Sequence, residues 1–450
     1  MTSWLLDERV RLTDVAHLAL QLSRSTPGIT AAEVDVSVGR GYRVGVRGGD
    51  VETLERAEDK AVSLTVYRGL QSGSVSFSDF SPAAIVQAVE KANFIATMIE
   101  PDPCNGLADP ELLARSYEDL DLYHPWDLPV REAILQMIAC ERKALASDQR
   151  IKCVEEAGLS TREHIRLYAN TDDFIGIIPS TMHQIACSLV AESSNGMERD
   201  GDYTCARDAK QLASLDWVAA ASVEKTVQRL DAKSIPPQRC PVLLDSAVAK
   251  GLLKHAIQLI TGPSLYRRQS CLMDAMGEQI FPEWLTLYQD PHERGGYGSA
   301  PFDNQGVRTV RQAFVENGIL TRFVLGAYAA RKLGLTTTGN AGGVYNLSIE
   351  APLTPFTALL KKMDRGLLVT EMMGQGVNLL TGDYSRGAAG YWVENGEIQY
   401  PVHEITLAGN LRDMFLHTVA LGDDVDRRTN VRVGSWLLES MIVAGEGQQP

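Results

Sequence analysis

Two of the eight histidines in this chain of 450 residues precede a glutamate, as His292-Glu293 and His403-Glu404. In the helical motif HExxH, two imidazoles one turn apart hold zinc, and the glutamate activates the bound water for hydrolysis. The second histidine is missing in both cases, because position 296 is glycine and position 407 is leucine. We therefore interpret both dipeptides as surface residues.

A third histidine, His255, lies in the apolar stretch GLLKHAIQLITG (251–262), which is typical of a buried helix. Four and five residues further on are Leu259 and Ile260, which cannot bind a metal, and Ala256 cannot act as a base. A lone histidine on an apolar helix is most often a packing residue whose ring is hydrogen-bonded. The residues alone thus favour a packing role for His255 over a ligand role.

Other catalytic motifs are incomplete. The chain contains no GxxxxGK[ST] phosphate-binding loop, and GRGYRVG (39–45) lacks the third glycine of a dinucleotide-binding turn. In DYSRG (383–387), Asp383 occupies the position where a serine nucleophile elbow needs glycine for its strained turn. We interpret this segment as a polar loop.

Composition narrows the function classes further. The formal net charge of −14 argues against binding to nucleic acid, whose backbone such a surface repels. No apolar run reaches 18 residues, and the N-terminus has no signal-peptide pattern, so we expect no membrane segment. Seven cysteines without a CxxC pair predict reduced thiols and a cytoplasmic protein.

The first two parts of the chain combine helical and strand-like patterns. The first has an amphipathic helix near its start and strand-like stretches at 32–39, 62–69 and 73–79, followed by a helix over 81–98 with Ser81 as its cap and proline in its first position. The second has helices over 130–145 and 216–230, the latter capped by Asp216, with strands at 162–167, 173–178 and 183–191 between them.

The third part follows a proline-rich break at 234–241. It opens with a buried strand (242–245) before the His255 helix. Two later segments, 314–320 and 391–398, place Asn-Gly between β-forming residues and predict hairpins with type I′ turns. We expect an α+β fold with an N-terminal α/β domain (1–105), a middle α+β domain (106–235) and a β-rich C-terminal domain (236–450).

Three long strings in the third part carry a resemblance. They are SAPFDNQGVRT (299–309), AARKLGLTTTGNAGG (329–343) and TEMMGQGVNLLTGDYSRGAAGYWVENGEIQYPV (370–402). Together they resemble the PmbA/TldD family of cytosolic metallopeptidases, also called modulators of DNA gyrase. The resemblance is dense from about residue 241 to 445 and looser in the first part.

The family contains two kinds of subunit that pair as a heterodimer. The TldD kind carries HExxxH on a helix and a cysteine near its C-terminus as the third zinc ligand, and the PmbA (TldE) kind lacks them. This chain resembles the PmbA kind. Laid on the motif, the first histidine falls on His255, the glutamate on Ala256, the second histidine on Ile260 and the cysteine on Val433. The resemblance thus implies that this chain binds no metal or other cofactor and that a TldD-type partner holds the zinc.

The remaining candidate site is the glycine-rich segment before the second hairpin. An exposed strand edge there could pair with an extended peptide, because glycine lets two backbones approach closely. We expect the following residues to lie near a peptide substrate: Gly382, Asp383, Tyr384, Ser385, Arg386 and Gly387. The alternative is that the glycines of this segment only permit turns.

The resemblance implies a subunit of a heterodimeric peptidase that acts on unfolded or small peptides, with this chain shaping the substrate channel. Self-association is the alternative when the partner is absent. One rival is an autonomous hydrolase that uses Cys187, Cys205 or Ser385, although no histidine is placed beside any of them. A second rival is a regulatory protein without proteolytic activity, as the gyrase-modulator name suggests.

Overall fold

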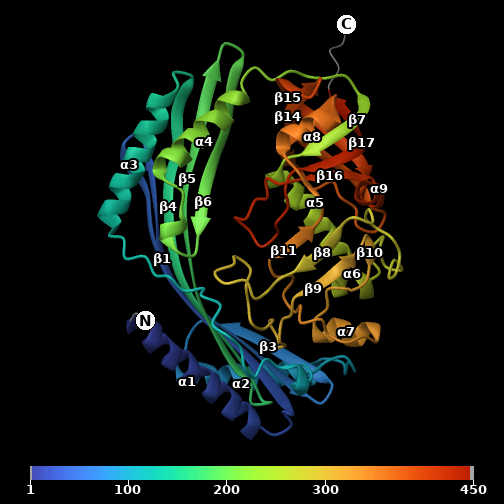
Figure 1. Ribbon diagram of the computed structural model, residues 1–450. Coiled ribbons are helices and arrows are strands. Elements are labelled where there is room, and N and C mark those ends of the chain that lie inside the picture. The colour runs from blue at the N-terminus through green and yellow to red at the C-terminus, as the bar shows by residue number, and fades with distance from the viewer. Residues whose placement is uncertain (1–2, 446–450) are drawn as a thin grey trace.

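The computed structural model describes residues 3–445 as three β-sheets with helices packed against them (Figure 1). The first sheet is antiparallel, with the strand order β3-β2-β1-β4-β5-β6. Its strands are β1 (Ala31–Arg47), β2 (Asp50–Arg68), β3 (Gln71–Phe77), β4 (Ile151–Asn170), β5 (Ile175–Ser193) and β6 (Gly196–Ala206). Residues 1–105 and 106–235, predicted as separate domains, both contribute to this sheet, because β1 pairs with β4 from Glu33 to Val46.

Two pairs of helices cover the two ends of this long sheet. Helices α1 (Ser3–Ser25) and α2 (Pro82–Met98) bury their apolar faces against the first half of β1. Helices α3 (Val130–Ser147) and α4 (Leu215–Gln228) cover the other end, around Val44 and Val46. The predicted helices are confirmed, and Ser81 caps α2 as expected.

The predicted cap of α4 is wrong. Ser214, two residues earlier, accepts the N–H of Trp217 at 3.2 Å, while Asp216 lies inside the first turn. Both residues suit a helix start, since serine and aspartate oxygens accept free N–H groups, and a negative charge favours the first turn.

The part of the chain from β7 to β17 (residues 238–445), which we call the C-terminal body, contains a second sheet that closes on itself. In it, β7, β13, β14, β15 and β17 pair in sequence, and β17 pairs with β7 again, so these five strands form a ring. The strands of this sheet are β7 (Gln238–Leu244), β12 (Leu353–Thr354), β13 (Gly366–Met373), β14 (Asp383–Glu394), β15 (Glu397–Asn410), β16 (Thr418–Gly422) and β17 (Trp436–Gly445). Closure leaves no edge strand within this ring, whereas β16 and β12 extend from β17 outside it.

A third, small sheet and five helices complete the body. The sheet has the order β10-β9-β8-β11, with β8 (Thr286–Gln289), β9 (Gln312–Glu316), β10 (Ile319–Leu320) and β11 (Leu347–Glu350). The helices are α5 (Ser246–Leu259), α6 (Gly262–Tyr266), α7 (Ala327–Leu333), α8 (Phe356–Met363) and α9 (Leu411–Leu416). The α+β fold class is thereby confirmed.

Both predicted Asn-Gly hairpins are present. Asn317 and Gly318 have φ angles of 50° and 79°, and Asn395 and Gly396 have φ angles of 56° and 72°. Positive φ at both central residues is the requirement of a type I′ turn, which asparagine and glycine meet at low cost. Across the described residues, no helix combines the length and the apolarity that a membrane crossing needs.

Candidate functional site

Helix α5 carries His255 at the border of its buried face. Asp245 caps the helix by accepting the N–H of Ala247 at 2.7 Å, and its own N–H bonds the carbonyl of Val369 on β13. This capping fixes the start of α5 against the closed sheet. The helix then buries Leu252, Leu253, Ala256 and Ile257 in the core of the C-terminal body and leaves His255 half-buried.

His255 faces Tyr384 of β14. Their rings meet edge to face, with centroids 6.2 Å apart and planes at 79°. Both ring nitrogens of His255 are buried without a hydrogen bond among the described residues. Burial lowers the pKa of His255, and the nearby charge of Arg386 lowers it further, against a weaker opposing influence of Gln258. His255 is therefore a neutral packing residue at neutral pH.

The other positions onto which the resemblance places the zinc motif are apolar and buried. Ala256, Ile260 and Val433 are 3%, 1% and 2% exposed, and all belong to the hydrophobic cluster that also contains Tyr384. Between residues 3 and 445, no group of three or more His, Cys, Asp or Glu side chains could hold a metal ion. One imidazole among alkyl side chains does not fit Zn²⁺, which needs three or four nitrogen, sulfur or oxygen ligands.

The segment from Gly382 to Gly387 starts β14 beside α5. Gly382 adopts a φ of 80°, and its carbonyl accepts the N–H of Leu411 at 2.7 Å, which joins the turn to α9. Tyr384 is buried, whereas Asp383 and Ser385 are exposed on the opposite face of the strand. The structure thus brings the helix on which the resemblance places the zinc motif and the predicted substrate segment together through Tyr384.

The expected open strand edge does not exist in this conformation. On one side, β14 pairs with β15, with Asp383 opposite Asn410. On the other side, the N–H of Ser385 donates to the carbonyl of Gly376 at 2.7 Å, and the N–H of Asn378 donates to the carbonyl of Asp383 at 2.9 Å. A peptide could reach the exposed side chains here, but it could pair with the β14 backbone only if residues 374–378 moved away. The substrate role of residues 382–387 stays a prediction.

The glycines of this segment have two different structural roles. Gly374 and Gly382 adopt positive φ angles of 74° and 80°, which permit turns. Gly376 instead allows a close approach, since a Cβ atom there would lie 1.8 Å from the carbonyl oxygen of Ser385.

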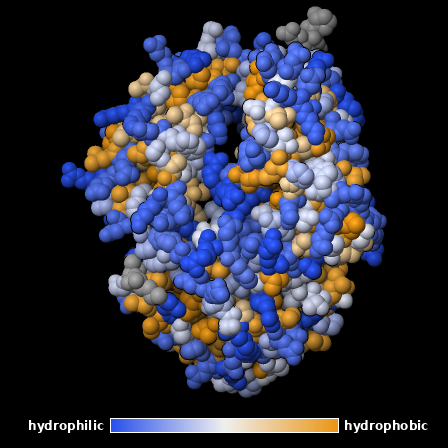
Figure 2. Space-filling view, viewed as in Figure 1, coloured by the Kyte–Doolittle hydropathy of each residue, from blue (hydrophilic) through white to orange (hydrophobic). Residues whose placement is uncertain are grey.

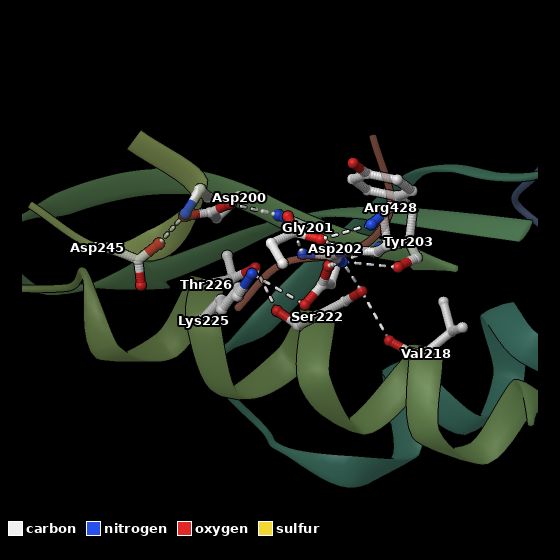
Figure 3. Close-up of polar contacts among 12 residues, drawn as sticks. Asp200, Gly201, Asp202, Tyr203, Val218, Ser222, Lys225, Thr226, Asp245 and Arg428 are labelled. Carbon is white, nitrogen blue, oxygen red and sulfur yellow. Dashed lines mark hydrogen bonds and ion pairs between the residues drawn. The ribbon is translucent and has the colours of Figure 1, made fainter. Parts of the chain in front are cut away.

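A network of charged side chains, which our sequence reasoning missed, joins the six-stranded sheet to the C-terminal body. Figure 3 shows its part around Lys225, Asp202 and Arg428. Asp202 on β6 binds Lys225 of α4 at 2.8 Å and Arg428 at 2.6 Å. Arg428 also binds Asp426 at 2.9 Å, and Asp426 binds Lys250 of α5 at 2.7 Å. The charge-rich string DDVDRR (423–428) is the only signal of this network in the sequence.

The network holds its carboxylates in the charged form. Burial alone would raise the pKa of Asp426, but hydrogen bonds from Arg428 and Lys250 outweigh it and lower that pKa. The pKa of Asp202 is lowered in the same way. Burial would raise it, but the hydrogen bonds from Lys225, the N–H of Tyr203 and Arg428 outweigh burial. The segment around Asp426 and Arg428 is therefore joined to α5 by the Lys250–Asp426 ion pair and to β6 by the Arg428–Asp202 pair.

The candidate nucleophiles are not activated. Contact with the thiol of Cys140, followed by burial, raises the pKa of Cys187. Burial raises the pKa of Cys205, although Arg428 opposes it. A reactive cysteine needs a lowered pKa, because the thiolate is the nucleophile. In the described part of the chain, no histidine is hydrogen-bonded to Cys187, Cys205 or Ser385.

Comparisons with known proteins cover nearly the whole chain. Family models for the PmbA/TldA metallopeptidase match as domain 1 (residues 32–96), central domain (123–230) and C-terminal domain (237–445). The chain is 43% identical to "Metalloprotease PmbA" of Escherichia coli O157:H7 over 98% of this chain and 97% of that protein. It is 40% identical to "Metalloprotease PmbA homolog" of Haemophilus influenzae over 99% of this chain and 98% of that protein.

Solved structures agree in fold. TldE from Thermococcus kodakarensis superposes with a TM-score of 0.82 at 17% identity, covering 97% of this chain and 100% of that one. A structure from Bacteroides thetaiotaomicron, whose name suggests a modulator of DNA gyrase, gives a TM-score of 0.89 at 24% identity, covering 96% and 98%.

Proposed function

This chain belongs to the PmbA/TldD metallopeptidase family, and from that premise we propose that it is the subunit without a zinc centre in a two-subunit peptidase. The partner, a TldD-type subunit, would supply the zinc, its ligands and the general base. This chain would supply part of the substrate channel and the pairing surface. The substrates would be unfolded or small peptides, and the cytoplasm would be the compartment, which fits the seven free cysteines among the described residues.

The observation that carries this proposal is the state of the zinc-motif positions. His255 is neutral and faces Tyr384, while Ala256, Ile260 and Val433 are buried among apolar side chains. Removing two of three ligands and the general base leaves no means of binding zinc or activating its water. The hydrolytic chemistry would therefore have to come from another chain.

The shape of the molecule supports a channel role. Figure 2 shows the surface hollowed between the six-stranded sheet and the C-terminal body, with hydrophilic side chains at the hollow. A polar hollow can admit a peptide backbone without the desolvation penalty that an apolar one imposes. The charge network of Asp202, Arg428 and Asp426 would keep the two sides of this hollow in fixed positions.

The test compares this chain, a TldD-type subunit and their mixture. Each sample is assayed for zinc by elemental analysis and for cleavage of an unstructured peptide, with and without a chelator. We expect cleavage only by the mixture, loss of cleavage with the chelator, and zinc only in the other subunit. Tightly bound zinc and cleavage in this chain alone would overturn the proposal. Co-purification with a topoisomerase instead of a peptidase subunit would favour a regulatory role.

A further inference from the structure

We propose that a groove in the C-terminal body binds carboxylate groups of acidic peptides. This inference rests on the proposed function and specifies which peptides this subunit would favour. The groove has a volume of about 610 Å³ and is lined by Leu112, Val307, Arg308, Val310, Arg311, Gln312, Arg322 and residues 336–339. It is separate from the His255 and Tyr384 site, since neither residue lines it.

The charge of the groove opposes that of the whole chain. Three arginines line it, Arg308, Arg311 and Arg322, and its lining contains no Asp or Glu residue. Within the described residues, Arg308 and Arg322 have no ion-pair partner within 4.0 Å. Arg311 has one ion pair there, with Asp290 at 3.7 Å, and its guanidinium lies over the Tyr288 ring at 4.7 Å from the centroid. The chain as a whole has a net charge of −14. These three guanidinium groups lie close together with little neutralisation, so the groove has a local positive potential that attracts anions.

Neutral acceptors hold two of these arginines in place. Arg322 donates to the side-chain oxygen of Gln312 and to the carbonyl of Ala313, both at 3.3 Å. Gln312 is itself fixed, because its amide donates to the carbonyl of Thr338 at 2.8 Å. Arg308 donates to the carbonyl of Glu111 at 2.9 Å. A guanidinium has five N–H donors, so each arginine keeps donors for a ligand.

The remaining lining favours a peptide over a free inorganic ion. Leu112, Val307 and Val310 give the groove apolar walls that suit the stems of side chains. Its volume lies within the range of about 300 to 1,000 Å³ that is usual for organic ligands. Guanidinium groups match carboxylates in a two-pronged geometry, which a lysine cannot reproduce. A short peptide with acidic side chains or a free C-terminal carboxylate combines these features.

The experiment measures peptide binding to the full chain without its partner, by fluorescence anisotropy. One labelled peptide carries four glutamates and a free C-terminus, and the matched peptide carries glutamines and a C-terminal amide. We expect the acidic peptide to bind more tightly, and Arg308→Gln and Arg322→Gln each to weaken it about tenfold, as loss of a charge-assisted hydrogen bond predicts. Arg365→Gln is the control, since Arg365 is 65% exposed outside the groove.

Three results would overturn the groove assignment: equal binding of both peptides, equal binding by the Arg308 and Arg365 variants, or binding of inorganic phosphate without binding of the acidic peptide. Competition of phosphate with the acidic peptide would support it, because both are oxyanions. Arg308→Gln is the safer variant, because Arg308 is exposed and its loss leaves the Gln312 contacts intact. Failure of the mixture to cleave any peptide would instead overturn the proposed function and leave the binding result standing.

Discussion

His255 of α5 and Tyr384 of β14 stack edge to face, with ring centroids 6.2 Å apart. This contact joins the helix on which the resemblance places the zinc motif to the start of the segment that we predicted for substrate. An aromatic pair of this geometry contributes about 0.5–1.5 kcal/mol beyond burial. In this chain, His255 takes part in side-chain packing at this helix.

The His255 contact predicts a pH-dependent stability difference. Because the pKa of His255 is lowered in the folded state, the unfolded chain binds its proton more readily, and folding stability falls as pH drops through the unfolded value of about 6.5. His255→Phe keeps an aromatic ring and removes this proton uptake. Chemical denaturation at several pH values should show the variant gaining stability relative to the natural chain as pH falls from 7.5 to 5.5. A constant difference would contradict the environment described for His255.

His164 and His183 also contribute to the pH dependence of stability in that measurement. Burial lowers the pKa of both, so they contribute a loss of stability of the same sign. The comparison between variant and natural chain cancels their contribution.

The Lys250–Asp426 pair predicts a large loss on breaking the charge network. Their side chains are 12% and 4% exposed, and Asp426→Ala would leave Lys250 without a partner in the core. We expect a loss of about 3 kcal/mol in the free energy of unfolding. The double variant Lys250→Met, Asp426→Leu should lose less free energy of unfolding than Lys250→Met and Asp426→Leu lose in sum as single variants. The reason is that neither charge of the pair is then left buried without its partner.

An exposed pair provides the control for this cycle. Lys152 and Glu192 are 59% and 44% exposed, so Lys152→Met should cost less than about 1 kcal/mol. The network also predicts acid sensitivity: the pKa of Asp426 is lowered, so its contribution is present above the unfolded value of about 3.9 and is lost as pH falls towards the folded value. Equal effects of Asp426→Ala and Lys152→Met would show that the network is not stabilising.

Gly376→Ala tests the pairing of residues 374–378 with β14. The new Cβ would lie 1.8 Å from the carbonyl oxygen of Ser385, so the strand pairing must open. We expect a loss of about 1–3 kcal/mol, as for other overpacked sites, and faster proteolysis near residue 376. Gly251→Ala is the matched control, because a Cβ there meets nothing within 4 Å and alanine favours a helix by about 0.5–1 kcal/mol. Similar stability of the two variants would disprove the close approach.

The cysteines should be dispensable for catalysis. Cys187 is 1% exposed and its pKa is raised, and burial also raises the pKa of Cys205. In the mixed two-subunit assay, Cys187→Ala and Cys205→Ala should retain peptidase activity. Loss of activity in a correctly folded variant would revive the hypothesis of a thiol hydrolase.

Local features could be read from the sequence because their causes lie within a few residues. The Asn-Gly pairs at 317–318 and 395–396 form the predicted turns because these residue types tolerate positive φ. The start of α2 is also set locally, because the Ser81 side chain accepts the N–H of Ala84 and proline suits the first turn. The predicted cap of α4 was wrong because serine and aspartate both suit a helix start, and the local sequence does not decide between Ser214 and Asp216.

The sequence by itself thus determined the family strings, the turns and most helices, while the assignment of Ala256, Ile260 and Val433 to lost zinc-ligand and base positions stays a prediction from the resemblance. Only the tertiary structure decided that β1 pairs with β4, that β7 meets β17 to close a ring, and that residues 374–378 cover the edge of β14. It also brought Lys225, Asp202, Arg428, Asp426 and Lys250 into one network. These contacts join residues that are far apart in the chain. They are stable because the folded molecule buries both partners together, and a local sequence pattern does not show which distant residues will be buried together.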